Sequence, residues 1–171
     1  MRKTLTIAVA VLALGAAACG KKQVAPEVLP PPTEAPPGET VAPGDVELTE
    51  LPAAQADLIA KAGSDTVYFG TDKYDLDQAT QATLAAQAQW LIANPNVRAS
   101  IEGHADERGT REYNMALGER RANAARDFLV AQGVPTARLQ VTSWGKERPV
   151  APGSNEEAWA QNRRAVTVLV R

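Results

Sequence analysis

The stretch that decides the fold is Ile101-Glu-Gly-His-Ala-Asp-Glu-Arg-Gly-Thr-Arg-Glu-Tyr-Asn-Met-Ala-Leu-Gly-Glu-Arg-Arg-Ala-Asn-Ala124. At its start, residues 97–103 alternate apolar and polar side chains, which is the pattern of a half-buried strand. A charged, glycine-flanked loop follows. From Glu112 to Gln132 the apolar residues recur at helical spacing, and Gly133 is a typical helix end. The stretch therefore predicts a strand, a polar loop and a long helix.

The chain from residue 51 onward continues this alternation of helices and strands. Asp77 and Asn155 are suitable N-caps for two of the helices. The last strand is apolar on both faces, which is typical of an interior strand. This order predicts an α/β domain, with about four strands in one layer and helices packed on them. We expect helices over 51–62, 77–94, 112–132 and 155–162, and strands over 66–69, 97–103, 139–144 and 165–170.

The first 19 residues have the anatomy of a secretory signal. A basic start precedes an apolar run over residues 5–14, and small residues lead to Cys19, the only cysteine of the chain. The apolar run is shorter than the ~20 residues that a membrane-spanning helix needs. The position of the cysteine resembles a bacterial lipobox, although Ala16 stands where leucine is usual. We expect residues 1–18 to be removed and Cys19 to carry N-palmitoyl and S-diacylglycerol groups, with ordinary secretion as the alternative.

Residues 20–50 contain seven prolines among glycines and acids, and they contain no aromatic residue. Such a segment cannot bury enough apolar surface to fold. At ~3.1 Å per residue in polyproline II conformation, it could reach on the order of 90 Å. We expect residues 19–50 to form a disordered tether between a lipid anchor and the domain. By resemblance to lipoprotein sorting signals, Gly20 after the cysteine favours the outer membrane.

The composition argues against several classes of function. A formal net charge of −2 over 171 residues argues against nucleic-acid binding. A single Cys cannot form an internal disulfide, and a single His cannot build a His-rich metal site. The sequence has neither a P-loop nor a G-x-S-x-G motif. We expect no cofactor, no resident metal and no catalytic residue, and we interpret His104 as a packing residue of the loop.

Two charged groups of the opening stretch are candidates for binding. On a helical projection, Arg121 and Asn114 lie on or beside the apolar face marked by Leu117 and Tyr113. An unpaired buried guanidinium is costly, so Arg121 needs a carboxylate partner. That partner is either Asp106 or a ligand's carboxylate. The residues alone leave open a structural salt bridge or a site that binds both charged ends of an amino acid. We interpret the other charges of the stretch as solvated: Glu107, Arg108, Arg111 and Glu112.

Several segments, in order, resemble the OmpA-like peptidoglycan-binding domain. They are Val67-Tyr-Phe-Gly-Thr-Asp-Lys-Tyr-Asp75, Gly103-His-Ala-Asp-Glu-Arg-Gly-Thr110, Tyr113-Asn114, Leu117-Gly-Glu-Arg-Arg-Ala122, Ser143-Trp-Gly-Lys-Glu-Arg-Pro149 and Asn162-Arg-Arg-Ala165. The resemblance covers residues 66–171, and the lipobox and tether fit the lipoprotein members of the family. It implies a two-layer sandwich with a mixed sheet, in a domain that we place at residues 51–171.

The resemblance also implies a ligand and the residues that bind it. The ligand is the stem peptide of peptidoglycan, usually carrying meso-diaminopimelate. Asp106 and Arg121 would hold the free amino-acid end of that residue. Thr71 departs from the bulkier apolar residue often found at its position, and Arg164 is chosen over Arg163 by resemblance alone. The positions implied to complete the pocket are Thr71, Asp72, Asn114, Leu117 and Arg164.

The role implied by the resemblance is non-covalent anchoring of the outer membrane to the wall. Its lipoprotein members work in the Tol system, which supports membrane integrity and division, so TolB and TolA are the implied partners. A stator-type or other OmpA-like wall anchor is the alternative. A stator would need a spanning helix with an acidic residue, which residues 4–18 do not provide. A wall hydrolase would need a nucleophile–base pair, a metal site or paired carboxylates, and the sequence offers no convincing one.

Overall fold

The structure, a computed structural model, describes residues 50–171. The expected signal segment 1–18, Cys19 and the proline-rich segment up to residue 49 lie outside this part of the chain. Within residues 50–171, no helix is both long enough and apolar enough to cross a membrane.

Helices and strands alternate along the described chain as the sequence predicts. Every predicted element is present, and its ends lie within one residue of those expected. The short 3-10 helix before the third strand is absent from the prediction. The elements are α1 Pro52–Ala62, β1 Thr66–Tyr68, α2 Gln78–Ala93, β2 Arg98–His104, α3 Arg111–Ala131, the 3-10 helix η1 Thr136–Arg138, β3 Leu139–Gly145, α4 Glu156–Asn162 and β4 Arg164–Val170.

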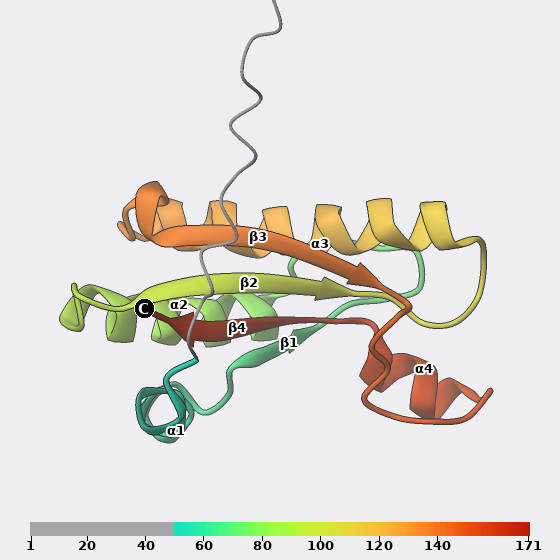
Figure 1. Ribbon diagram of the computed structural model, residues 1–171, viewed down its shortest axis with the longest axis horizontal. Helices are drawn as coiled ribbons and strands as arrows, with labels where there is room; N and C mark the ends of the chain where they lie inside the picture. Colours follow the sequence, from blue (N-terminus) through green and yellow to red (C-terminus); the bar gives the residue numbers. More distant parts are fainter. Residues whose placement is uncertain (1–49) are drawn as a thin grey trace, which may run out of the picture. The chain divides into compact units, whose positions relative to one another are not determined.

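The four strands form one mixed sheet in the order β1-β4-β2-β3. β4 is antiparallel to both β1 and β2, whereas β2 and β3 are parallel. Parallel neighbours need a crossover connection, and α3 supplies it. In Figure 1 the sheet faces the viewer, and α2 and α3 lie behind it. The predicted two-layer α/β sandwich and the interior position of β4 are therefore confirmed.

Side-chain caps begin the helices where the sequence places them. Asp77 Oδ1 accepts a hydrogen bond from the amide of Thr80 at 2.8 Å, and Asn155 Oδ1 accepts one from the amide of Ala158 at 2.9 Å. Each cap satisfies a backbone N–H that has no partner inside its own helix. The predicted N-caps are confirmed.

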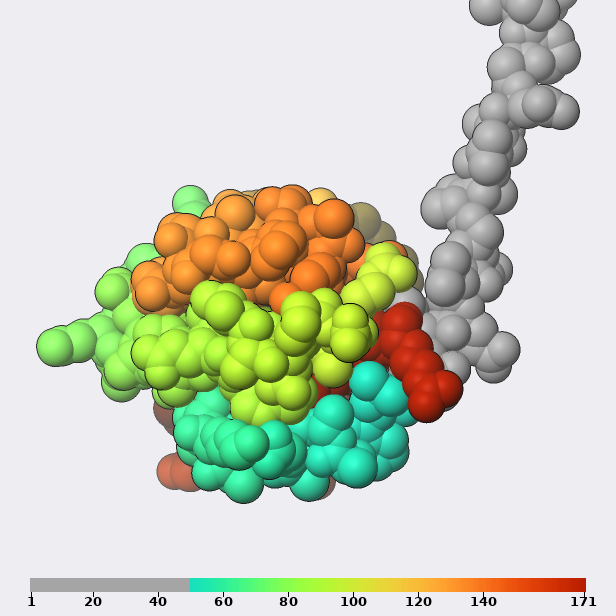
Figure 2. All heavy atoms as spheres, turned by 90° about the vertical axis from the view of Figure 1, so that its left-hand side faces the viewer, coloured from blue at the N-terminus to red at the C-terminus, as the bar shows by residue number. Residues whose placement is uncertain are grey.

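One arginine from η1 closes the other end of α2. The guanidinium of Arg138 donates to the carbonyl oxygens of Leu91, Asn94 and Val97, at 2.9 Å and 2.8 Å for the first two. The carbonyl of Leu91 lies in the last turn of the helix and the other two follow it, where a cation is favourable. Figure 2 looks onto this end of the domain, where the segment before β3, in orange, lies against the segment between α2 and β2, in green. Arg138 thereby links two connections that are distant in sequence.

The core lies between the sheet and the helices behind it, and α3 turns a different face to it than predicted. Leu117 is buried as expected, but the buried face also includes Arg121, Ala125 and Leu129. Tyr113, which the projection placed on the core face, is 42% exposed. The buried face of α3 is rotated about the helix axis relative to the predicted face, because the apolar spacing gave too much weight to Tyr113. As a result, Arg121 lies in the middle of the buried face and not at its edge.

A pair of glycines sets how closely α3 approaches β2. A Cβ atom on Gly103 would overlap the carbonyl oxygen of Gly118, and one on Gly118 would overlap the side chain of Ser143. The backbones of helix and strand therefore touch directly, which only glycine permits. This contact brings Arg121, one turn after Gly118, over the loop that follows β2.

Candidate ligand-binding site

A small cavity lies where the loops after β1 and β2 meet. Both strands run antiparallel to β4, so they run in the same direction and their loops leave the same edge of the sheet. β4 begins at that edge as well, which brings Arg163 close to both loops. The cavity has a volume of about 240 Å³ and is lined by Thr71, Asp72, Asp106, Arg108, Gly109 and Tyr113.

Asp106 is the most buried carboxylate of this cavity, at 8% exposure. Its Oδ1 accepts from Nε of Arg108 at 3.1 Å, and its Oδ2 accepts from Nη2 of the same arginine at 2.7 Å. A second guanidinium nitrogen, Nη1 of Arg163, lies 3.6 Å from Oδ2. Burial works to raise the pKa of Asp106, but the hydrogen bonds and charge of Arg108, and the charge of Arg163, outweigh it and lower the pKa. The carboxyl group is ionised at neutral pH.

Arg121 does not pair with Asp106, so the structural salt bridge, one of the two alternatives that the residues left open, is not formed. Its side chain is fully buried, and it donates to three backbone carbonyl oxygens: Nε to Lys73 at 2.9 Å, Nη1 to His104 at 2.8 Å and Nη2 to Gly70 at 3.0 Å. Carbonyl dipoles meet the need for partners that a carboxylate was expected to meet. Burial lowers the pKa of Arg121 to about 10, which leaves it charged at neutral pH. Arg121 thus ties the two loops of the cavity together.

Thr71 and Asp72, both exposed, line the cavity, while their contact with a ligand stays a prediction. Asp72 has a φ of 54°, and no other non-glycine residue among those described has a positive φ. Asp is one of the few side chains that tolerate this left-handed conformation. The hydroxyl of Tyr113 donates to Oδ1 of Asp72 at 3.3 Å, which places the exposed tyrosine across the cavity.

Asn114 and Leu117 lie beneath the cavity and do not line it. Both are buried, at 2% and 3% exposure. The side-chain amide of Asn114 donates to the carbonyl oxygen of Arg108 at 2.7 Å and so fixes the loop after β2. Both residues therefore support the loop from the buried side and are not exposed to the cavity.

The two arginines at the start of β4 have different surroundings, and Arg163 is the one beside Asp106. Arg163 donates to the carbonyl of Phe69 at 3.1 Å and to Glu156 Oε1 at 2.7 Å, and its Nη1 points toward Asp106 without a hydrogen bond. Arg164 lies on the opposite face of the sheet, where it donates to the carbonyl of Arg148 at 3.3 Å. Arg163, and not Arg164, is thus the arginine beside Asp106, while a ligand contact by Arg164 stays a prediction. Alternation along a strand predicts that neighbouring side chains lie on opposite faces of the sheet, but it does not predict which of the two lies near the loops.

His104 is buried at 2% exposure, in agreement with its interpretation as a packing residue. Burial, followed by the positive charges of Arg164 and Arg148, lowers the pKa of His104 to about 3. The imidazole is therefore neutral at physiological pH. Its carbonyl oxygen is one of the three that hold Arg121.

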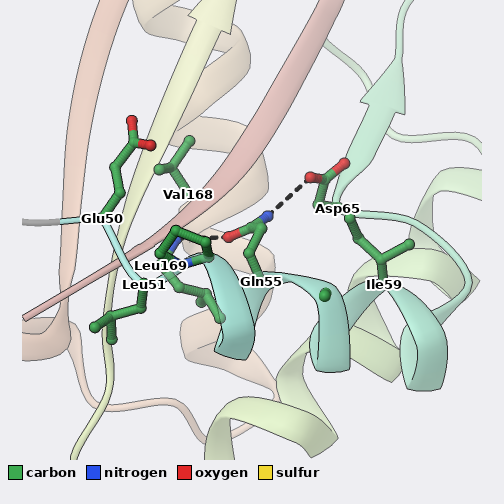
Figure 3. Close-up of a pocket in the computed structure, with 9 residues that line it drawn as sticks. Glu50, Leu51, Gln55, Ile59, Asp65, Val168 and Leu169 are labelled. Atoms are coloured by element: carbon green, nitrogen blue, oxygen red, sulfur yellow. Dashed lines mark hydrogen bonds between the residues drawn. The ribbon is translucent and has the colours of Figure 1, made fainter.

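A larger cavity, of about 410 Å³, lies between α1 and β4 and has a different character. Leu51, Ile59 and Val168 line it together with Gln55, which donates to Asp65 at 2.8 Å and accepts from the amide of Leu169 at 2.9 Å (Figure 3). It contains none of the residues predicted to bind a ligand, and no cationic side chain lines it. Within residues 50–171, no group of three or more His, Cys, Asp or Glu side chains is placed to hold a metal ion.

The geometry of this site agrees with a family relationship. A model described as the OmpA family matches residues 68–163, which include the whole cavity. The chain belongs to the OmpA family. This OmpA-family chain is 54% identical over 118 residues to the peptidoglycan-associated lipoprotein of Agrobacterium fabrum, and the match covers 69% of this chain and 66% of that protein. It is 52% identical over 118 residues to the peptidoglycan-associated lipoprotein of Brucella abortus, covering 69% and 70%.

Two solved structures share the same architecture. The crystal structure of the peptidoglycan-associated lipoprotein from Burkholderia pseudomallei is 47% identical and has a TM-score of 0.61, covering 63% of this chain and 91% of that one. The C-terminal domain of Helicobacter pylori MotB, at 21% identity and a TM-score of 0.57, covers 61% of this chain and 83% of that one and agrees in fold alone. The resemblance stated from the sequence is confirmed.

Two residues that line the OmpA-family cavity, and a third that lies beside Asp106, were not predicted as members of the site. Arg108 was interpreted as solvated, yet it holds Asp106 and lines the cavity. Tyr113 was assigned to the core, and Arg163 was set aside for its neighbour. The signal that could have found Arg108 is its position two residues after a buried carboxylate in a tight loop, where its backbone N–H also reaches Asp106 at 3.1 Å.

Proposed function

We propose that the domain binds the stem peptide of peptidoglycan without forming a covalent bond, and that it anchors a membrane to the cell wall. One observation carries the proposal. A cavity with a buried, ionised Asp106 and a facing guanidinium lies in an OmpA-family chain whose relatives are named peptidoglycan-associated lipoproteins. Opposite charges at one small site suit a zwitterionic ligand.

The proposed recognition assigns each end of an amino acid to a separate part of the cavity. Asp106 receives the ammonium group, and Asp72 across the cavity adds a second negative charge. Nη1 of Arg163 is buried, has no hydrogen-bond partner in the described chain and lies 3.6 Å from Oδ2 of Asp106, so we propose it as one donor to the carboxylate. Arg121 acts by holding the two loops in place, and it contacts the ligand only if one of its three carbonyl partners moves. Diaminopimelate, with a free amino-acid end, is the ligand that we propose.

The proposed activity is binding alone, without catalysis or a cofactor. His104 has a pKa of about 3 and is therefore a poor proton acceptor at neutral pH. Asp106 is occupied by guanidinium groups and is held ionised. Neither group has the environment of a general acid or base near pH 7.

The proposed setting in the cell rests on the sequence of the first 50 residues. We propose that residues 1–18 are removed, that lipidated Cys19 anchors the chain in the outer membrane, and that 19–50 spans the distance to a wall-binding domain at 51–171. Confinement to the membrane beside a dense array of ligands raises the effective concentration, so modest affinity suffices. TolB and TolA are the proposed protein partners.

Co-sedimentation with purified peptidoglycan sacculi tests the proposed binding. Asp106→Asn removes the charge but keeps the shape, so it should stay in the supernatant while the wild-type protein pellets. Asp127→Asn, which changes an exposed carboxylate on α3, is the matched control and should pellet. Equal pelleting of the Asp106 variant and the wild type would show that the cavity is not the wall-binding site.

Two further measurements test the remaining parts of the proposal. Incubation of sacculi with the protein should release no soluble muropeptide, and release would indicate an enzyme. Pull-down with purified TolB should retain the domain, whereas a stator-type anchor outside the Tol system would not be retained.

A further inference from the structure

Asp106 is already paired with a cationic side chain of the protein, that of Arg108. Arg108 approaches it side-on, with Nε 3.1 Å from Oδ1 and Nη2 2.7 Å from Oδ2, and the backbone N–H of Arg108 adds a bond of 3.1 Å to Oδ1. Both carboxylate oxygens are engaged by the same residue in the paired geometry that an arginine and a carboxylate prefer. Arg108 fills three of the roughly four acceptor sites of the carboxylate, and Nη1 of Arg163 lies 3.6 Å from Oδ2. A ligand's ammonium group can therefore pair with both oxygens of Asp106 only by replacing Arg108.

The two partners of this ion pair differ greatly in their freedom to move. The side chain of Asp106 is 10% exposed and that of Arg108 is 39% exposed. The guanidinium of Arg108 lies 4.1 Å from the centre of the Trp159 ring. Trp159 is itself held by a hydrogen bond from its Nε1 to Glu107 Oε1 at 3.1 Å. The arginine can therefore keep its cation–π contact with Trp159 after it leaves the carboxylate.

Arg108 also stays within reach of whatever enters the cavity. It is one of the lining residues, and its Nη2 lies 3.5 Å from the hydroxyl of Thr71 on the opposite wall. A guanidinium released from Asp106 can be hydrated on its exposed side, but it needs a new anionic partner to recover the lost ion pair. A ligand that carries a carboxylate beside its ammonium group supplies one, whereas a ligand with an ammonium group alone does not.

We propose that Arg108 makes the site selective for zwitterions, because it must be displaced from Asp106 by the ligand's ammonium group and is then paired again by the ligand's carboxylate. This inference rests on the proposed function and concerns the same cavity. A ligand with only a positive charge would lose the ion pair between Arg108 and Asp106 without replacing it. The apparent affinity of such a ligand is its intrinsic affinity multiplied by the fraction of protein molecules in which Asp106 is free.

Calorimetry with two synthetic probes tests the selectivity. One probe is a stem tripeptide that ends in meso-diaminopimelate with a free carboxylate beside the terminal ammonium group, and the other has that carboxylate amidated. The wild-type protein should prefer the free acid. Arg108→Gln should bind the amidated probe more tightly than the wild type does, by roughly tenfold, and should lose most of the preference.

A matched control separates displacement of Arg108 from a general change of charge. Arg111→Gln removes the same charge three residues further along, at the start of α3, from an exposed residue that pairs with Glu147 at 3.4 Å and not with Asp106. It should keep the wild-type affinity for both probes. The proposal is wrong if Arg108→Gln leaves the preference unchanged, or if Arg111→Gln gains as much affinity as Arg108→Gln does.

A measurement without ligand distinguishes failure of this inference from failure of the proposed function. The Asp106 carboxyl carbon can be titrated by NMR in the wild type and in Arg108→Gln, and its pKa should rise in the variant. An unchanged pKa would overturn the inference whatever the ligand is. A raised pKa together with no binding of either probe by any variant would sink the proposed function, while the pairing of Arg108 with Asp106 would stand.

Discussion

Replacement of Arg121 by methionine tests whether this residue holds the cavity together. The change keeps the length and much of the volume of the side chain but removes three hydrogen bonds to the carbonyls of Lys73, His104 and Gly70. A hydrogen bond from a charged donor contributes about 1.5–3 kcal/mol. Two of the three carbonyls are only partly buried and can return to water, and the cost of burying the guanidinium disappears. The expected net loss is therefore about 2–4 kcal/mol of unfolding free energy.

Thermal and urea unfolding, followed by circular dichroism, measure this loss. At roughly 4 °C per kcal/mol for a domain of this size, the Tm should fall by about 8–16 °C. Arg120→Met is the matched control, because Arg120 is the exposed neighbour on the same helix and should change stability by less than about 0.5 kcal/mol. If the Arg121 variant is as stable as the wild type, or if both variants lose the same amount, the three carbonyl contacts do not stabilise the loops.

Two further predictions concern packing and pH. Gly103→Ala should destabilise the domain by about 1–3 kcal/mol or more, because the added Cβ would overlap the carbonyl of Gly118 and force α3 away from β2. An unchanged midpoint of urea unfolding would contradict this close approach. His104 has a pKa of about 3 in the folded protein and takes up a proton below about 6.5 when unfolded, so between these values the unfolded state binds more protons and stability falls as pH falls. From pH 7 to pH 5 the wild type should therefore lose about 2 kcal/mol more than His104→Gln does, and equal losses in urea titrations would show that the folded histidine is not held neutral.

The periodicity of the sequence was sufficient to predict the helices and strands, because each depends on local signals. Asp77 and Asn155 cap their helices as their residue types favour, and β4 is apolar on both faces because it is an interior strand. The 3-10 helix over Thr136–Arg138 has no such signal. Its role comes from Arg138, which reaches carbonyls more than 40 residues away, and such a contact depends on the tertiary fold.

The site was harder to predict, because its residues meet through loops. Helical phase correctly marked Arg121 as a buried cation, but it could not show that carbonyls from two loops would take the place of a carboxylate. Helical phase could not predict the partner of Asp106 either, because Arg108 reaches it within the loop, two residues further along the chain. Alternation along β4 separated Arg163 from Arg164 but did not determine which of them faces the cavity.

The most direct test of the account is an NMR titration of the isotope-labelled domain with the soluble diaminopimelate tripeptide. The account predicts that the largest shifts occur at Asp106, Arg108, Thr71 and Asp72, and that Asp106→Asn abolishes them. Shifts confined to the cavity between α1 and β4, at Gln55, Ile59 and Val168, would contradict it, as would shifts that persist in the Asp106 variant.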